Sequence, residues 1–113
     1  MSKPNLKATI ASTGTVSSEL ALGDYKFFVI STDENFVGTT LTLKAVDDRG
    51  NTLATQKDSG AAQAALVITT TGASSARVPV GDLATAMAAM DRCTLTSTAA
   101  QTGTASVITV IAK

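Results

Sequence analysis

Histidine and tryptophan are absent from this chain, and cysteine occurs once. Without an imidazole the chain lacks the commonest general base, and it can form neither a Ser-His-Asp nor a Cys-His catalytic arrangement. A zinc site would lack its usual nitrogen ligands and would have a single sulfur. The sequence also contains no Gly-x-Ser-x-Gly elbow, no Ser-x-x-Lys pair and no phosphate-binding glycine loop. We therefore expect a protein that is not an enzyme and that uses no cofactor and no metal.

Charge is scarce as well. Only 16% of the residues are charged, against about a quarter in an average soluble domain. Nine Lys and Arg balance nine Asp and Glu, and aromatic residues make up 4% of the chain. The basic residues are dispersed and few rings are present for base stacking, so we expect no binding to nucleic acid.

Zero net charge favours association, because nothing holds the molecules apart. We therefore expect the surface to be covered by other protein subunits, with a homo-oligomer as one form of that assembly. The alternative is a monomer whose many Ser and Thr side chains solvate the surface without charge. The two long uncharged stretches, 59–76 and 93–112, are interrupted by Thr, Ser, Gln and Gly. Neither is the unbroken apolar run of a membrane span, and the chain begins without an apolar signal segment.

Apolar and polar residues alternate along most of the chain, which is typical of half-buried β-strands. The clearest turn is 47–51, where Gly50 can adopt a positive φ, so the flanking runs should pair as a hairpin. We expect a second, closing hairpin between 93–99 and 104–112, with Cys93 acting as a small buried hydrophobe. Strands are expected at 6–11, 15–22, 25–30, 38–46, 52–57, 66–71, 77–80, 93–99 and 104–112, and one helical turn is possible at 61–65.

One further segment has a helical pattern. Leu83, Met87 and Met90 recur at i, i+4 and i+7 among alanines, and Asp82 is a suitable N-cap residue. This predicts a short helix near residues 82–91 that covers one end of the sheets. The chain is therefore expected to be mainly β: a β-sandwich or compact barrel of roughly seven to nine short antiparallel strands with one helix. Residues 1–5 should form a flexible arm, and residues 6–113 a single β domain.

The carboxylates are a candidate catalytic site, because a pair of them can hydrolyse glycosides. Asp33 and Glu34 share one turn, and Asp47 and Asp48 share another. Adjacent acids in turns are usually solvated, and an Asp often caps its own turn backbone. Asp47, Asp48 and Asn51 offer oxygens to a calcium ion, but their spacing matches no known calcium loop.

Thin charge, Ala and Thr each near a sixth of the chain, a short polar arm and many short strands together resemble small virion proteins of tailed bacteriophages. The resemblance is to capsid decoration (cement) proteins and small head or tail structural proteins. The resemblance lies in the composition and strand pattern of the whole chain and includes no diagnostic motif. It implies a structural protein made in the host cytoplasm and located in the virion, which stabilises the shell by bridging subunits of the major capsid protein.

Such a protein needs surfaces that bind a neighbour. The candidate edge strands are 15–22 and 77–80, since an exposed strand edge can pair with another chain. The alternative function is a carbohydrate- or receptor-binding β-sandwich module of a tail or fibre, which would need an exposed aromatic ring; Phe36 is the residue expected to be exposed. The candidate interaction residues are therefore Lys3, Pro4, Asn5, Leu6, Lys7 and Phe36.

Overall fold

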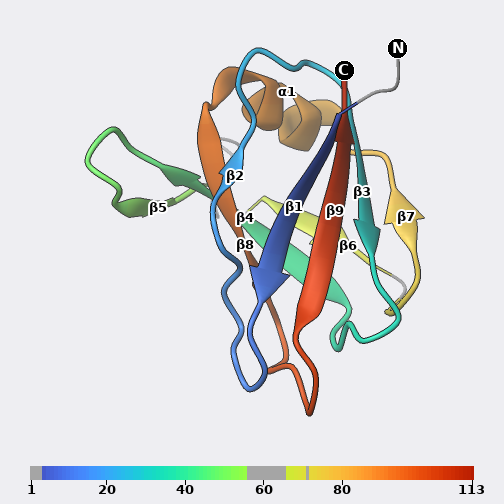
Figure 1. Cartoon of the computed structure of the whole chain (residues 1–113). Helices are drawn as coiled ribbons and strands as arrows, with labels where there is room; N and C mark the ends of the chain where they lie inside the picture. The colour runs from blue at the N-terminus through green and yellow to red at the C-terminus, as the bar shows by residue number, and fades with distance from the viewer. Residues whose placement is uncertain (1–3, 56–65, 71) are drawn as a thin grey trace, which may run out of the picture.

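The computed structural model describes residues 4–55, 66–70 and 72–113, and they form a β-sandwich with one short helix (Figure 1). The predicted fold class, mainly β with antiparallel strands and a single helix, is confirmed. In chain order the elements are β1 (Asn5–Ile10), β2 (Leu20–Ala21), β3 (Phe28–Thr32), β4 (Thr40–Val46), β5 (Thr52–Ala54), β6 (Val67–Thr69), β7 (Ala76–Arg77), α1 (Gly81–Ala89), β8 (Arg92–Ser97) and β9 (Ser106–Ala112). The expected helical turn at 61–65 lies outside the described residues.

The first sheet has the strand order β1-β9-β3-β7, and every pairing in it is antiparallel. Its strands alternate strictly between the two faces, as the period of two along an extended chain requires. Ile108 and Val110 of β9 and Ile30 of β3 point inward and are at most 2% exposed. The last strand, β9, is central in this sheet, where it pairs with β1 on one side and with β3 on the other.

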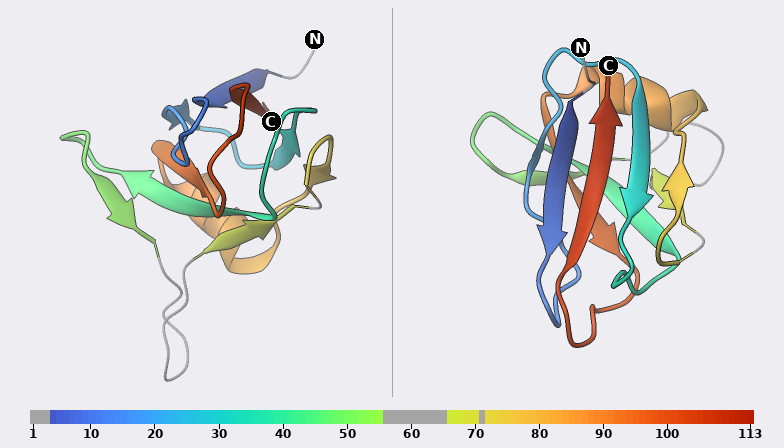
Figure 2. Two further views of the ribbon diagram at one scale, coloured as in Figure 1. Left: turned by 90° about the horizontal axis from the view of Figure 1, so that it is seen from below. Right: turned by 45° about the vertical axis from the view of Figure 1, so that its right-hand side comes forward.

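The second sheet has the order β2-β8-β4-β5, and β6 also pairs with β4. β5 and β6 pair with opposite ends of β4, so together they form one side of this sheet. The inner faces of the two sheets form a common core, to which this sheet contributes Leu41, Leu43, Ile68, Cys93 and Leu95. The predicted hairpin between β4 and β5 is confirmed; Gly50 has a φ of 84° there, and the hairpin projects from the body of the sandwich (Figure 2).

The expected closing hairpin is wrong. β8 pairs with β2 and β4 in the second sheet, whereas β9 pairs with β1 and β3 in the first. The intervening segment therefore crosses between sheets instead of turning within one. Both strands have apolar inner faces, and placing them in opposite sheets buries those faces against each other across the core. Alternation alone cannot distinguish the two arrangements, because each strand shows the same pattern in both.

Helix α1 covers one end of the sandwich (Figure 1). Met87 is completely buried, and Leu83 and Met90 pack against the core, so the predicted apolar face is confirmed. The expected N-cap is wrong: the helix begins at Gly81 with Val80 as its N-cap, and no side chain caps it. Asp82 instead lies in the first turn, where its negative charge interacts favourably with the helix dipole.

The two sheets meet on one side of the sandwich and remain apart on the other. On the closed side, the backbone N–H of Ser18 donates to the carbonyl of Thr9 at 2.9 Å, and Ile10 and Ser17 form an isolated bridge between the sheets. On the open side lie β6 of one sheet and β7 of the other. The expected edge strands 15–22 and 77–80 are confirmed only in part. β2 and β7 are the terminal strands of the two sheets, but they include only Leu20–Ala21 and Arg77 of these segments. The segment before β2 is bonded to β1, so of the two only β7 lies on the open side.

Candidate interaction surface

The outer face of the first sheet carries a group of exposed apolar side chains. The strand register places Ile111 of β9 beside Val29 of β3, and Val78 follows the edge strand β7. Together with Phe27 these residues line a shallow hollow of about 220 Å³. Phe27 is 72% exposed, Val78 66% and Ile111 37%. We refer to Phe27, Val29, Val78 and Ile111 as the apolar patch.

The exposure of Phe27 follows from the alternation of β3. Phe28 and Ile30 point into the core, so Phe27 and Val29 point outward. Two backbone hydrogen bonds between Phe27 and Lys113 continue the pairing of β3 with β9. The N–H of Phe27 donates to the carbonyl of Lys113 at 3.1 Å, and the N–H of Lys113 donates to the carbonyl of Phe27 at 3.0 Å. The backbone therefore fixes the outward direction of the ring. Contiguous exposed apolar side chains of this kind are typical of surfaces that bind another molecule.

Lysines flank the apolar patch. Lys113 lines the same hollow, and Lys26 lies beside Phe27 with its Nζ donating to the carbonyl of Ala88 at 3.1 Å. Lys7 lies on the same face of β1, opposite Thr109. The one ion pair between described residues involves none of these lysines. A partner with an apolar centre and carboxylates at its rim would complement this surface in shape and in charge.

The predicted arm residues come together beside this patch. The carbonyl of Pro4 accepts a hydrogen bond from the N–H of Ala112 at 3.0 Å, and Asn5 pairs with Ile111. β1 begins at Asn5, one residue earlier than the expected strand, and Lys7 is exposed. Leu6, by contrast, packs against the core. Lys3 lies outside the described residues.

The expected exposure of Phe36 is wrong, since this side chain is 4% exposed and belongs to the core. The turn before it explains why. Oδ1 of Asp33 accepts the N–H of Asn35 at 3.1 Å, and the N–H of Phe36 donates to the carbonyl of Asp33 at 3.4 Å. These bonds fold the loop back, so the ring enters the sandwich. The exposed aromatic ring is that of Phe27, which lies in the strand expected at 25–30.

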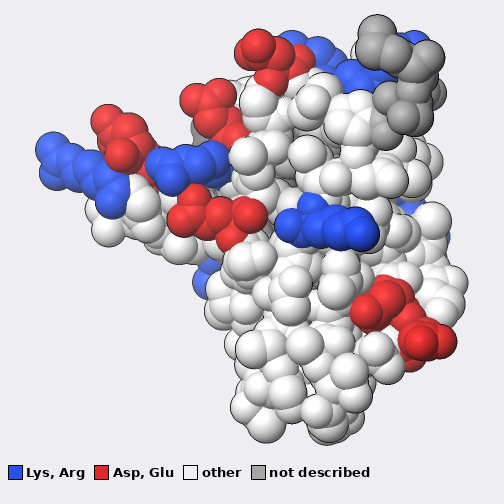
Figure 3. Space-filling view, viewed as in Figure 1, with Lys and Arg blue, Asp and Glu red and all other residues white. Residues whose placement is uncertain are grey.

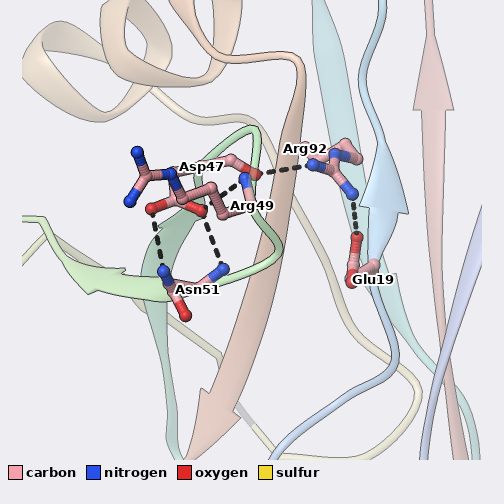
Figure 4. A network of polar contacts seen from close by, with 5 residues as sticks. All are labelled: Glu19, Asp47, Arg49, Asn51 and Arg92. Atoms are coloured by element: carbon pink, nitrogen blue, oxygen red, sulfur yellow. Dashed lines mark hydrogen bonds and ion pairs between the residues drawn. The ribbon is translucent and has the colours of Figure 1, made fainter.

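The acidic turns are structural. In the β4–β5 turn, Oδ1 of Asp47 accepts the backbone N–H groups of Arg49 at 2.9 Å and Asn51 at 2.8 Å (Figure 4). These bonds, led by that from Asn51, lower the pKa of Asp47 below its ordinary value of 3.8. The Arg92 guanidinium donates to the carbonyl of Asp47 at 2.6 Å and pairs with Glu19 at 3.0 Å, which attaches the hairpin to β8 and the segment before β2. Among the described residues no group of His, Cys, Asp or Glu is arranged to hold a metal ion.

The tip of the sandwich opposite α1 is uncharged on the face in Figure 3, and acidic side chains lie to one side of it. Gln101, which the sequence analysis did not single out, organises the loops at this end while being only 1% exposed. Its Oε1 accepts the N–H of Val37 and the hydroxyl of Ser106, both at 2.8 Å. Its Nε2 donates to the carbonyl of Val37 at 2.9 Å and to that of Ala99 at 3.2 Å. The loop between β8 and β9 is thereby fixed to the one between β3 and β4.

Comparison with known proteins supplies one structural neighbour. No family model matches the sequence, and no curated protein matches it significantly. The crystal structure of the SPBc2 prophage-derived protein YomS superposes with a TM-score of 0.51 at 12% identity, over 100% of this chain and 98% of that one. The chain shares its fold with a prophage-derived protein. Within the described part of the chain, no helix is long and apolar enough to cross a membrane.

Proposed function

We propose that this chain is a non-enzymatic structural protein of a bacteriophage particle, and that it decorates the capsid and stabilises the shell by binding neighbouring capsid subunits. The observation that carries the proposal is the apolar patch, which holds Phe27 in water on a rigid sheet. The fold shared with the prophage-derived protein YomS supports a phage origin.

The charge balance supports a surface that is covered in the working state. The chain has nine acidic and nine basic residues, and lysines flank the apolar patch. An interface with an apolar centre and a polar, charged rim is the usual anatomy of protein association. The root of the N-terminal arm, at Pro4 and Asn5, lies against the same strand as Ile111. The patch together with Pro4 and Asn5 offers one surface to a capsid subunit.

The experiment removes the patch without disturbing the core. Phe27→Ser removes the exposed ring. Val16→Ser is the matched control, because Val16 is 53% exposed but lies between β1 and β2, away from the patch. Each protein is mixed with purified shells of the phage that carries the gene, and bound protein is separated from free by sedimentation. Burial of a Phe ring is worth about 1.5–3 kcal/mol, so Phe27→Ser should weaken binding roughly tenfold or more.

Three results would contradict the proposal. The first is a wild-type protein that ignores the shells, and the second is equal loss of binding in both variants. The third is a glycan whose affinity depends on Phe27, because this would establish the receptor-binding function instead. Mass spectrometry of purified particles adds an independent measure: the chain should be present in many copies per particle.

A further inference from the structure

The open side of the sandwich contains a groove of about 600 Å³. Residues 66–69 line one wall and residues 77–83 line the other, so the groove lies between the edge of the second sheet and the segment that leads from β7 into α1. Figure 2 shows β6 and β7 on this side of the sandwich, in different sheets. This groove adjoins the hollow of the apolar patch, with which it shares Val78.

The β6 wall presents backbone groups that no described residue binds. β4 pairs Thr40 with Thr69 and Thr42 with Val67. The N–H of Leu43 donates to the carbonyl of Leu66 at 2.9 Å, and the N–H of Thr70 donates to that of Thr39 at 2.7 Å. In an antiparallel ladder this pattern places Val67 and Thr69 in non-hydrogen-bonded pairs with their partners on β4. The N–H and C=O groups of Val67 and Thr69 therefore point away from β4.

The outward-pointing N–H and C=O groups of β6 have the spacing needed to bind an additional strand. Val67 and Thr69 are two residues apart on β6, so their N–H and C=O groups repeat at the interval at which an added extended chain presents its own. The side chains between and beside them are apolar: Leu66 and Ile68 are at most 4% exposed and form the inner wall. On the opposite wall Val80 is 75% exposed. The groove therefore combines backbone partners for a strand with a lining of mixed apolar and polar side chains.

The volume fits a short strand. Residues in a strand rise about 3.3 Å each, strands lie about 4.8 Å apart and packed sheets about 10 Å apart, which gives about 160 Å³ per residue. A groove of about 600 Å³ thus has room for roughly four extended residues. β6 together with Leu66 offers four positions along its length.

We propose that this groove binds an extended segment of another protein subunit, which adds to β6 as an antiparallel strand with apolar side chains at alternate positions. The proposal deepens the virion function proposed above, on which it rests for the identity of the partner. It assigns the open side of the sandwich to strand addition and the apolar patch to face-to-face packing. One copy would then contact two neighbours through two different surfaces.

The test uses the isolated chain and a defined peptide. The peptide, acetyl-Thr-Thr-Leu-Thr-Leu-Lys-amide, copies residues 39–44, whose Leu41 already pairs with the inward-facing Ile68 of β6. Amide NMR spectra recorded during titration should show shifts at Val67 and Thr69. A peptide N-methylated at alternate residues keeps its side chains but loses the donors, so it should bind at least tenfold more weakly.

Two variants at one position separate backbone from side chain. Val67→Pro deletes the N–H that points into the groove, and an edge strand tolerates proline where its N–H is not part of the ladder. Val67→Ala keeps that N–H and removes only the side chain beyond Cβ. Val67→Pro should lose at least tenfold in peptide affinity, whereas Val67→Ala should lose less. Unfolding midpoints confirm that both variants are folded, and Thr69→Pro provides a second deletion if Val67→Pro is not.

The proposal is overturned by equal binding of the N-methylated peptide, or by the absence of shifts at Val67 and Thr69 at millimolar peptide. A concentration-dependent dimer that Val67→Pro dissociates would also overturn it, in favour of a second copy of this chain as the occupant. The peptide experiment involves no shells. Failure of shell binding therefore refutes the virion function while peptide binding still establishes the groove.

Discussion

Replacing Gln101 with alanine should destabilise the protein more than any other polar substitution in the loops opposite α1. The side chain makes four hydrogen bonds while being 1% exposed. Each is worth about 0.5–1.5 kcal/mol net, and a buried group left without a partner costs about 1–3 kcal/mol. The carbonyl of Val37 keeps its bond from Ser97 Oγ at 3.0 Å, but the N–H of Val37 and the hydroxyl of Ser106 lose theirs. Gln101→Ala should therefore lower the free energy of unfolding by about 3 kcal/mol.

Urea denaturation followed by circular dichroism measures this loss as a lower midpoint at an unchanged m-value. The melting temperature should fall by roughly 10 °C. Thr102→Ala is the matched control, because Thr102 is an exposed neighbour in the same loop; its effect should stay within about 0.5 kcal/mol. A double-mutant cycle of Gln101→Ala with Ser106→Ala should give a coupling of about 1 kcal/mol. A cost below about 1 kcal/mol for Gln101→Ala, or no coupling, would refute the claim that this side chain joins the loops.

Three further measurements follow from the core and the β4–β5 turn. The lowered pKa of Asp47 means that its contribution to stability is present above pH 3.8 and is lost as the pH falls through the lower folded value; Asp47→Asn should remove this acid-dependent step, and an unchanged pH profile would contradict it. Burial raises the pKa of Cys93 to about 12, so Ellman's reagent at pH 8 should react with this thiol only as fast as the chain unfolds. Rapid labelling of the native protein would instead place the thiol at the surface. Leu95→Ala, at a fully buried position, should cost about 2–5 kcal/mol by denaturation, while Leu53→Ala on the projecting hairpin should cost less than about 1 kcal/mol.

Turns, the helix and the burial of Cys93 could be predicted from the sequence, because short segments of the chain specify them. The turn at 47–51 closes a hairpin because Gly50 adopts a positive φ and Asp47 caps the turn backbone. Helix α1 forms where alanines surround Leu83 and Met87, and Cys93 is buried within a strand. These features depend on neighbours within a few residues, so propensity and periodicity suffice to predict them.

The candidate surface was only partly predictable. Asn5 and Lys7 lie on the outer face of β1, and their role in binding stays a prediction, but the expectation that the ring of Phe36 is exposed was wrong, since the exposed ring is that of Phe27. Both rings lie in short apolar contexts, and which one points outward depends on where β3 begins and how the loop at Asp33 folds back. Gln101 was missed because a lone glutamine in a polar loop carries no sequence signal of its burial.

Composition and periodicity were enough to assign the class of the molecule: alternating apolar residues predict strands, and a chain without histidine has no imidazole chemistry. The folded arrangement was needed to show that β8 and β9 lie in opposite sheets, and that the sandwich is closed at β1 and β2 but open between β6 and β7. This division arises because a strand's alternation specifies which side chains are buried but not which strand lies beside it. Partner strands are selected by hydrogen bonding and packing between residues far apart in the chain, and these interactions place β6 and β7 in different sheets.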